Sequence, residues 1–163
     1  MEKYGKDFFI KDFNNFIRNI KYDKSTISYA TNTIMIDFKN RTCNRIYSFW
    51  LDPAWRIVFS NKIIINSFNY PYHENYTKLE QKKEEDDFGK WCSKTDFMKH
   101  VKIKNIHILE SCDLIIEWEN GAVLDKFVND MEDDDYVFYD HIEGKKYRFS
   151  YGNIKQVDLE ISD

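Results

Sequence analysis

The sequence is poor in the residues that cross-link or bend a polypeptide. Its 163 residues include 3 cysteines, 2 prolines and 5 glycines. Three cysteines without a Cys-x-x-Cys spacing argue against a disulfide framework and against a structural zinc site. So few prolines and glycines argue against disorder and low complexity. We therefore expect one folded domain spanning residues 1–163, with reduced thiols, in the cytoplasm.

Long hydrophobic runs are also missing. No apolar stretch approaches the roughly 20 residues that a membrane-spanning helix needs. The N-terminal segment from Met1 to Asp7 lacks the uninterrupted apolar core of a signal peptide. These features predict a soluble protein that has no membrane partner and works in the compartment where it is made.

Aromatic residues are abundant, at 17% of the chain, and they favour strands over helices. Apolar residues alternate with polar ones from Thr26 to Phe68, and the alternation resumes at Val101. A period of two over short segments separated by turn residues indicates antiparallel strands. The sequence therefore predicts an α+β fold that is mainly antiparallel β, with about ten strands in a meander-like sheet or half-barrel.

Two segments have the pattern or composition of helices. Residues 8–21 carry apolar side chains at helical spacing, and Asp7 is placed to cap their N-terminus, with Asn14 on the polar face. The second helix is expected within residues 78–99, where Gly89 ends or kinks it. The first is interpreted as a helix that packs over the sheet, whereas residues 82–87 of the second are interpreted as a solvated face, with Trp91, Phe97 and Met98 reaching the core.

The clearest local signal is a β-hairpin between Asp113 and Val128. Two apolar runs flank Asn120-Gly121, the dipeptide most favoured in a two-residue type I′ turn. This register pairs Trp118 with Val123 and Leu114 with Phe127. It predicts that one set of side chains is buried, namely Leu114, Ile116, Trp118, Val123 and Phe127, and that another faces solvent, namely Glu117, Glu119 and Lys126.

The net charge of −4 hides a strong asymmetry along the chain. Residues 1–109 carry 19 Lys and Arg against 13 Asp and Glu, whereas residues 110–143 carry twelve carboxylates and one cation, Lys126. No basic stripe with interleaved aromatics suggests nucleic-acid binding. A concentrated acidic face instead suits a basic partner.

Residue patterns of common catalytic sites are absent from the sequence. It contains no phosphate-binding glycine loop, no Gly-x-Ser-x-Gly and no His-Glu-x-x-His. We expect no enzyme activity, no cofactor and no metal. Divalent-metal binding by the acidic run of residues 130–135 remains an alternative, although the run lacks the spacing of a calcium loop.

A second alternative is a small enzyme, or a protein that binds a ligand or metal, with its site near Arg56, Asp125 and His141. The predicted hairpin register turns Asp125 toward the same face as Ile116. A carboxylate on an apolar face is costly unless it is paired, so an edge position or a nearby Arg would explain it. The structural interpretation of Arg56 is a bridge between strands.

Two separated segments carry a family resemblance. The strand entry Asp52-Pro-Ala-Trp-Arg-Ile57 and the hairpin Asp113-Leu-Ile-Ile-Glu-Trp-Glu-Asn-Gly-Ala-Val-Leu124 together resemble small bacterial immunity proteins of contact-dependent growth inhibition and related polymorphic toxin systems. In those proteins a Pro-Trp-Arg strand precedes an Asp-Leu…Asn-Gly hairpin. The resemblance extends loosely over residues 26–140, and here Ala54 separates Pro53 from Trp55.

The resemblance implies a cytoplasmic protein that binds and neutralises one cognate toxin domain by occluding its active site. A basic, nuclease-type toxin would suit the acidic segment. The residues expected to contact the partner are carboxylates and tyrosines of residues 117–139, namely Glu117, Glu119, Asp130, Glu132, Asp133, Asp134, Asp135, Tyr136 and Tyr139.

Overall fold

The computed structural model describes residues 6–40, 46–71, 77–128, 136–141 and 143–159. Within these ranges the chain forms two α-helices, two short 3-10 helices and twelve strands, all paired antiparallel in two sheets. The expected α+β class with mainly antiparallel strands is confirmed. The strand number differs from the expected ten, and the strands form two open sheets rather than one.

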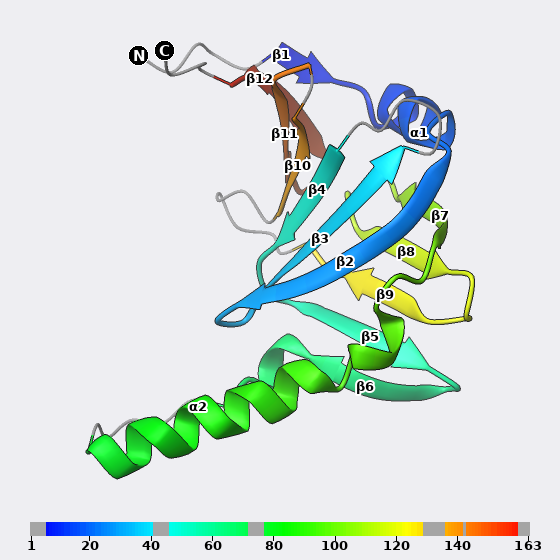
Figure 1. Cartoon of the computed structure of the whole chain (residues 1–163). Coiled ribbons are helices and arrows are strands. Elements are labelled where there is room, and N and C mark those ends of the chain that lie inside the picture. Colours follow the sequence, from blue (N-terminus) through cyan, green and yellow to red (C-terminus); the bar gives the residue numbers. More distant parts are fainter. Residues whose placement is uncertain (1–5, 41–45, 72–76, 129–135, 142, 160–163) are drawn as a thin grey trace.

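Seven strands form the first sheet (Figure 1). In spatial order they are β1 (Lys6–Phe8), β12 (Asn153–Asp158), β11 (Lys145–Ser150), β10 (Tyr136–Asp140), β4 (Ile46–Leu51), β3 (Thr33–Asn40) and β2 (Tyr22–Ala30). The other five form the second sheet, in the order β6 (Lys62–Asn66), β5 (Trp55–Phe59), β9 (Val123–Lys126), β8 (Leu114–Trp118) and β7 (Ile103–Ile108).

Most strands pair with their neighbour in sequence, as a meander predicts. The exceptions hold the architecture together: β4 pairs with β10, β5 pairs with β9, and β1 pairs with β12. The chain therefore starts in the first sheet, builds the second, and returns to complete the first. Strands β4 and β5 follow each other closely but belong to different sheets.

Helix α1 (Ile10–Arg18) is shorter than expected and starts later. Residues 6–8 form β1 instead, and Phe9 occupies the N-cap position without a side-chain cap, so the expected cap by Asp7 is wrong. Phe13 and Ile17 are fully buried as predicted, and Phe13 packs edge-on against Phe138 and other aromatic rings of the first sheet. Sequence periodicity identified the buried face of this helix but not its first residue.

Helix α2 (Lys78–Ser93) extends away from both sheets (Figure 1). Thr77 and Glu80 form a reciprocal capping box at its N-terminus, in which each side chain accepts a hydrogen bond from the other residue's backbone N–H. Trp91 is its only buried residue. The helix runs through Gly89 without ending there, and the 3-10 helix Asp96–Met98 follows it.

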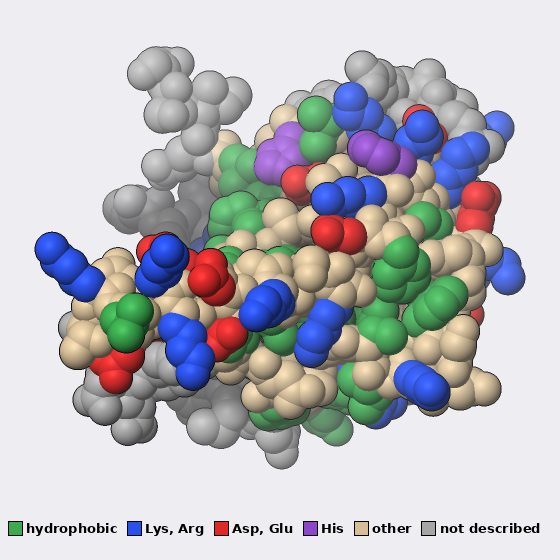
Figure 2. Space-filling model, turned by 60° about the horizontal axis from the view of Figure 1, so that its bottom comes forward, with side chains coloured by type: hydrophobic (Ala, Val, Ile, Leu, Met, Phe, Trp, Pro, Cys, Tyr) green, Lys and Arg blue, Asp and Glu red, His purple; other side chains and the backbone are tan. Residues whose placement is uncertain are grey.

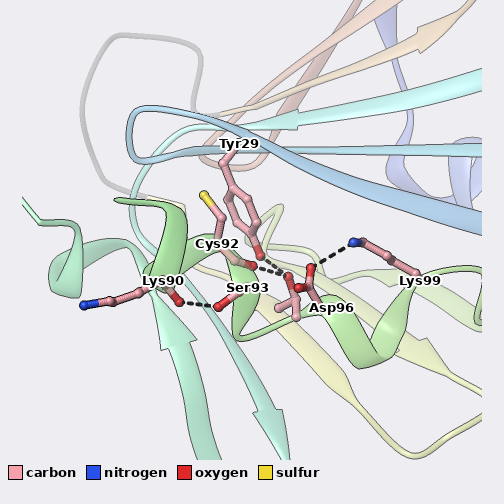
Figure 3. A network of polar contacts seen from close by, with 7 residues as sticks. Tyr29, Lys90, Cys92, Ser93, Asp96 and Lys99 are labelled. Atoms are coloured by element: carbon pink, nitrogen blue, oxygen red, sulfur yellow. Dashed lines mark hydrogen bonds and ion pairs between the residues drawn. The ribbon is translucent and has the colours of Figure 1, made fainter. Parts of the chain in front are cut away.

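The C-terminal end of α2 is joined to β2 by a small polar network (Figure 3). Tyr29 OH lies 2.8 Å from Thr95 Oγ1, and Thr95 Oγ1 donates to the Cys92 carbonyl at 3.2 Å. Burial raises the pKa of the Tyr29 hydroxyl above its usual value. This contact, with Tyr29 packed edge-on against Trp91, ties the helix to the edge of the first sheet.

The hairpin between β8 and β9 exists, but its register is shifted from the expected one. Trp118 N donates to the Ala122 carbonyl at 2.9 Å, and Gly121 N donates to the Trp118 carbonyl at 3.0 Å, so the loop has three residues. Gly121 has φ +87°, as a three-residue loop ending in a left-handed residue requires. The predicted type I′ turn is therefore wrong.

A shift of one residue exchanges the two faces of β9. Ala122, Leu124 and Lys126 are buried, while Phe127 is 40% exposed and Val123 lies on the outer face. The expected burial of Val123 and Phe127 and the expected exposure of Lys126 are thus both wrong.

Among the residues described, no helix is long and apolar enough to cross a membrane.

Candidate functional site

The acidic segment, residues 110–143, lies only partly within the described ranges. Asp130, Glu132, Asp133, Asp134 and Asp135 fall outside them. Glu119 is exposed in the hairpin loop, and Glu117 is half-buried on β8, where it accepts a hydrogen bond from Asn105 Nδ2 at 3.2 Å. Both acids are therefore at the surface of the second sheet.

The two tyrosines expected to contact a partner lie in different environments. Tyr136 is 1% exposed, donates from its hydroxyl to the Cys112 carbonyl at 2.7 Å and stacks on Phe149, so its expected role as a surface anchor is wrong. Tyr139 lies on the outer face of the first sheet, between Trp50 and His141. Strand alternation separates them, because residues three apart on a strand face opposite ways.

Lys126, the one cation of the acidic segment, is fully buried. Its Nζ donates to the carbonyls of Phe127 at 2.8 Å and Pro53 at 3.3 Å. Sequence alternation did not reveal this because the hairpin loop holds one residue more than the Asn-Gly signal suggested. The consequence is that segment 110–143 contributes no Lys or Arg charge to the surface.

The three residues proposed for a ligand site do not converge. Arg56 Nε donates to Asp125 Oδ2 at 2.9 Å across β5 and β9 of the second sheet, and the guanidinium lies 5.2 Å from the ring centre of Phe127. The observed register pairs Asp125 with Ile115 on the outer face of the sheet, so the expectation that it shares the face of Ile116 is wrong, although the expected arginine partner is present. His141 instead follows β10 in the first sheet, next to Ile46.

His141 does line a groove of about 870 Å³ that we call the outer groove. It lies on the outer face of β3 and β4 and is closed at one side by β2 and His100. Figure 2 shows histidine, basic, acidic and hydrophobic side chains gathered together on one face of the molecule.

Strand register arranges the outer groove in three rows. Met35 lies opposite Trp50 in the first row, Asp37 opposite Ser48 in the second, and Lys39 opposite Ile46 in the third. Thr26 extends the second row on β2. A bulge in β2 carries two more lining residues, Asp23 and Lys24, opposite the end of β3 near Lys39.

A hydrogen-bonded chain of three side chains forms the floor of the middle row. Ser48 Oγ donates to Asp37 Oδ1 at 2.5 Å and lies 2.9 Å from His141 Nε2. An ionised carboxylate can only accept, so the serine hydrogen is used on Asp37 and Ser48 Oγ accepts from the histidine. In a nucleophilic triad the histidine accepts the hydrogen bond of the serine. Here the donor direction runs from His141 to Ser48 to Asp37, so the chain orients these side chains for binding and does not activate Ser48.

An aromatic row accompanies this chain on the neighbouring strands. Tyr139 packs edge-on against Trp50 and stacks on His141, with ring centres 5.4 and 5.6 Å apart. Burial raises the pKa of Tyr139, and Lys146 Nζ lies 5.9 Å from its ring centre. Trp50 nevertheless remains 46% exposed, so its ring is available to a ligand.

Sequence analysis missed Asp37, Ser48 and Trp50 as site residues. Each is an outward residue in a strand whose alternate positions form the core, and Ser48 is isolated between Tyr47 and Phe49. Alternation could have placed all three on one outer face, but not beside His141, because β4 and β10 are about ninety residues apart in the chain.

Among the described residues, no group of three or more His, Cys, Asp or Glu side chains could hold a metal ion. The acidic run proposed as an alternative metal site lies outside those residues. Comparison of the chain with protein-family models, with curated protein sequences and with solved structures found no match.

Proposed function

We propose that the chain is an immunity protein that binds one cognate toxin domain and occludes its active site. The proposal combines the resemblance of the Trp55-Arg56 strand and the β8–β9 hairpin to such proteins with the charge of residues 110–143. The partner would be a basic, nuclease-type domain in the bacterial cytoplasm, and the chain itself would perform no catalysis.

The observation that carries the proposal is the burial of Lys126. Twelve carboxylates share segment 110–143 with this single cation, and its side chain is 0% exposed. A surface cation among these acids would weaken the attraction to a basic partner and would attract acidic proteins instead. With Lys126 inside the fold, every charged surface group that the segment supplies is negative.

In the described part of the segment, the acids that remain at the surface lie mostly on or next to the second sheet, and the exposed Glu143 follows β10 in the first sheet. Asp125 is neutralised by Arg56, and Asp140 is buried at 2% exposure, so these two contribute little to an external field. Glu110, Glu117 and Glu119 supply surface charge in the described part of the segment. We also assign to partner binding the five acids of residues 130–135, which lie outside the described ranges, and Tyr139 as an aromatic contact.

Electrostatic complementarity would act mainly on association. A nuclease cleft that binds phosphates is basic, and carboxylates would compete for the same cationic groups. Attraction between two oppositely charged surfaces raises association rate constants from about 10⁵–10⁶ to as much as about 10⁸–10⁹ M⁻¹s⁻¹ at low salt. Occlusion of the cleft, rather than any chemical step, would then neutralise the toxin.

The experiment uses the toxin domain encoded next to this protein, because immunity proteins are encoded beside their toxins. Co-expression with that domain is expected to restore bacterial growth. A variant with Asp130, Asp133, Asp134 and Asp135 changed to Asn and Glu132 changed to Gln is expected to associate more slowly, with much weaker salt dependence, in a stopped-flow or biosensor measurement.

The matched control neutralises a second acidic run, on α2. Glu84 and Glu85 are changed to Gln, and Asp86 and Asp87 to Asn, which should leave association and rescue unchanged. Failure of the wild-type chain to protect cells or bind the toxin would contradict the immunity function. Normal rescue with an unchanged salt slope in the five-acid variant would contradict the acidic surface.

A further inference from the structure

The outer groove lies on the first sheet and shares only Tyr139, which packs against Trp50, with the proposed partner surface. Its volume of about 870 Å³ lies within the roughly 300–1,000 Å³ of small-molecule sites. Successive rows on one face of a strand are two residues, or about 6.7 Å, apart. The three rows therefore place different chemistries along a line of roughly 13 Å.

The first row offers an aromatic surface. Trp50 is 46% exposed and held edge-on by Tyr139 from the next strand, while Met35 lies opposite it on β3. A rigid, partly exposed indole is a stacking surface for a planar ring, and stacking a base on an aromatic side chain contributes about 1–3 kcal/mol.

The middle row offers a carboxylate and a hydroxyl with fixed roles. Ser48 Oγ donates its hydrogen bond to Asp37 Oδ1, and the described residues provide no further hydrogen bond to Asp37. The second carboxylate oxygen of Asp37 can therefore accept a hydrogen bond from a ligand. A carboxylate that accepts from ribose hydroxyls is a recurrent feature of nucleotide sites. Asp37 is exposed, and Ser48, at 3% exposure, holds it in place.

The third row is the cationic end. Lys39 lies on β3, and Lys24 lies on the β2 bulge opposite, with His100 and His141 beside them, and among the described residues Asp23 is the acid of this row. Two lysines and His100 against this carboxylate favour an anion, because they can donate hydrogen bonds to phosphate oxygens, whereas the Nε2–H of His141 is already used on Ser48.

We propose that the outer groove binds a ribonucleotide unit, with its base against Trp50, its ribose at Asp37 and its phosphate between Lys24 and Lys39. The order aromatic, carboxylate, cation along the strands matches the order base, sugar, phosphate in the ligand. The unit comes either from a free mononucleotide or from single-stranded RNA, which presents the same three groups.

The experiment is a calorimetric titration of the full chain with the four ribonucleoside 5′-monophosphates and, separately, with a single-stranded oligoribonucleotide. Saturable binding of a monophosphate identifies a free nucleotide as the source. Binding of the oligonucleotide alone, weakened by salt, identifies RNA. Both results support the site only when the variants below respond; absence of binding by either ligand at millimolar concentration overturns it.

Three variants address the three rows. Trp50→Leu is expected to weaken binding roughly 10-fold or more through lost stacking. Lys39→Gln is expected to weaken binding and reduce its salt dependence. Asp37→Asn is expected to abolish the preference of the wild-type chain for a ribonucleotide over its 2′-deoxy analogue, which is a readout that a purely structural role would not change.

Matched controls lie outside the groove. Phe68→Leu removes an aromatic ring that is 80% exposed, and Lys104→Gln removes an exposed lysine of β7. Both should bind like the wild-type chain, and thermal unfolding of every variant checks that it is folded. Binding that is equal in Trp50→Leu, Lys39→Gln and the controls would overturn the proposal.

Discussion

Asn14 pairs with Ile108 through both ends of its side-chain amide. Its Nδ2 donates to the Ile108 carbonyl at 2.8 Å, and its Oδ1 accepts from Ile108 N at 3.0 Å. Helix α1 thus satisfies backbone groups of β7, which is an edge strand of the second sheet. Asn14 was expected on the polar face of the helix, yet it is buried because the edge of a sheet needs a hydrogen-bonding partner.

Replacing Asn14 with Leu should therefore destabilise the protein. Two buried backbone groups of Ile108 would lose their partners, so the free energy of unfolding should fall by about 3 kcal/mol. Urea denaturation followed by circular dichroism measures this change. The neighbouring Asn15→Leu is the control, because Asn15 is exposed, and it should change stability by less than about 0.5 kcal/mol. Equal effects of the two variants would contradict the role assigned to Asn14.

Lys126→Ala should also destabilise the fold. The substitution leaves a cavity and removes the donor that serves the carbonyls of Pro53 and Phe127, so we expect a loss of about 3 kcal/mol. The exposed Lys104→Ala serves as control and should lie within about 0.5 kcal/mol of the wild type. A neutral result for Lys126→Ala in chemical denaturation would show that its buried position has no structural role.

Arg56 and Asp125 should couple only weakly. Their side chains are 42% and 24% exposed, and solvent screens a pair of this kind. A double-mutant cycle with Arg56→Gln and Asp125→Asn should give a coupling free energy below about 1 kcal/mol. Arg56→Gln alone should cost slightly more than Asp125→Asn, because it also removes the contact with Phe127. A coupling of several kcal/mol would indicate that the pair is far less hydrated than its exposure implies.

Cys112 should be chemically inert in the folded protein. Burial raises the pKa of its thiol to about 11, from a reference value of 9.0. The thiolate fraction at pH 8 is therefore roughly 100-fold smaller than for an unperturbed cysteine. In a Cys43→Ser, Cys92→Ser variant, modification of the remaining thiol by Ellman's reagent should be slow until denaturant is added. Rapid modification in native buffer would contradict this environment.

The same group has a consequence for stability at high pH. The unfolded chain loses the Cys112 proton near pH 9, whereas the folded chain retains it until about pH 11. Between pH 9 and 11, ionisation of the Cys112 thiol lowers the free energy of the unfolded state but not that of the folded state. The contribution of Cys112 to the free energy of unfolding is therefore complete below pH 9 and declines from pH 9 to 11. Comparing unfolding of the protein and its Cys112→Ala variant over this pH range isolates the effect.

The sequence by itself determined most of the strand segments, though not β1, as well as which face of α1 is apolar and where negative charge is concentrated. These properties depend on side-chain period and on turn residues that act over a few positions. Local pattern failed at the β8–β9 loop. There, a three-residue loop ending at Gly121 replaced the expected two-residue turn and exchanged the faces that hold Lys126 and Phe127.

Only the tertiary structure decided how the hairpins combine. The pairing of β4 with β10 brings Ser48 within hydrogen-bonding distance of His141, and the pairing of β5 with β9 brings Arg56 to Asp125. Such contacts join residues that are far apart in the chain. Which residues meet depends on how the two sheets pack their apolar faces against each other. Alternation marks a face as outward, but the contents of the outer groove depend on which strands become neighbours.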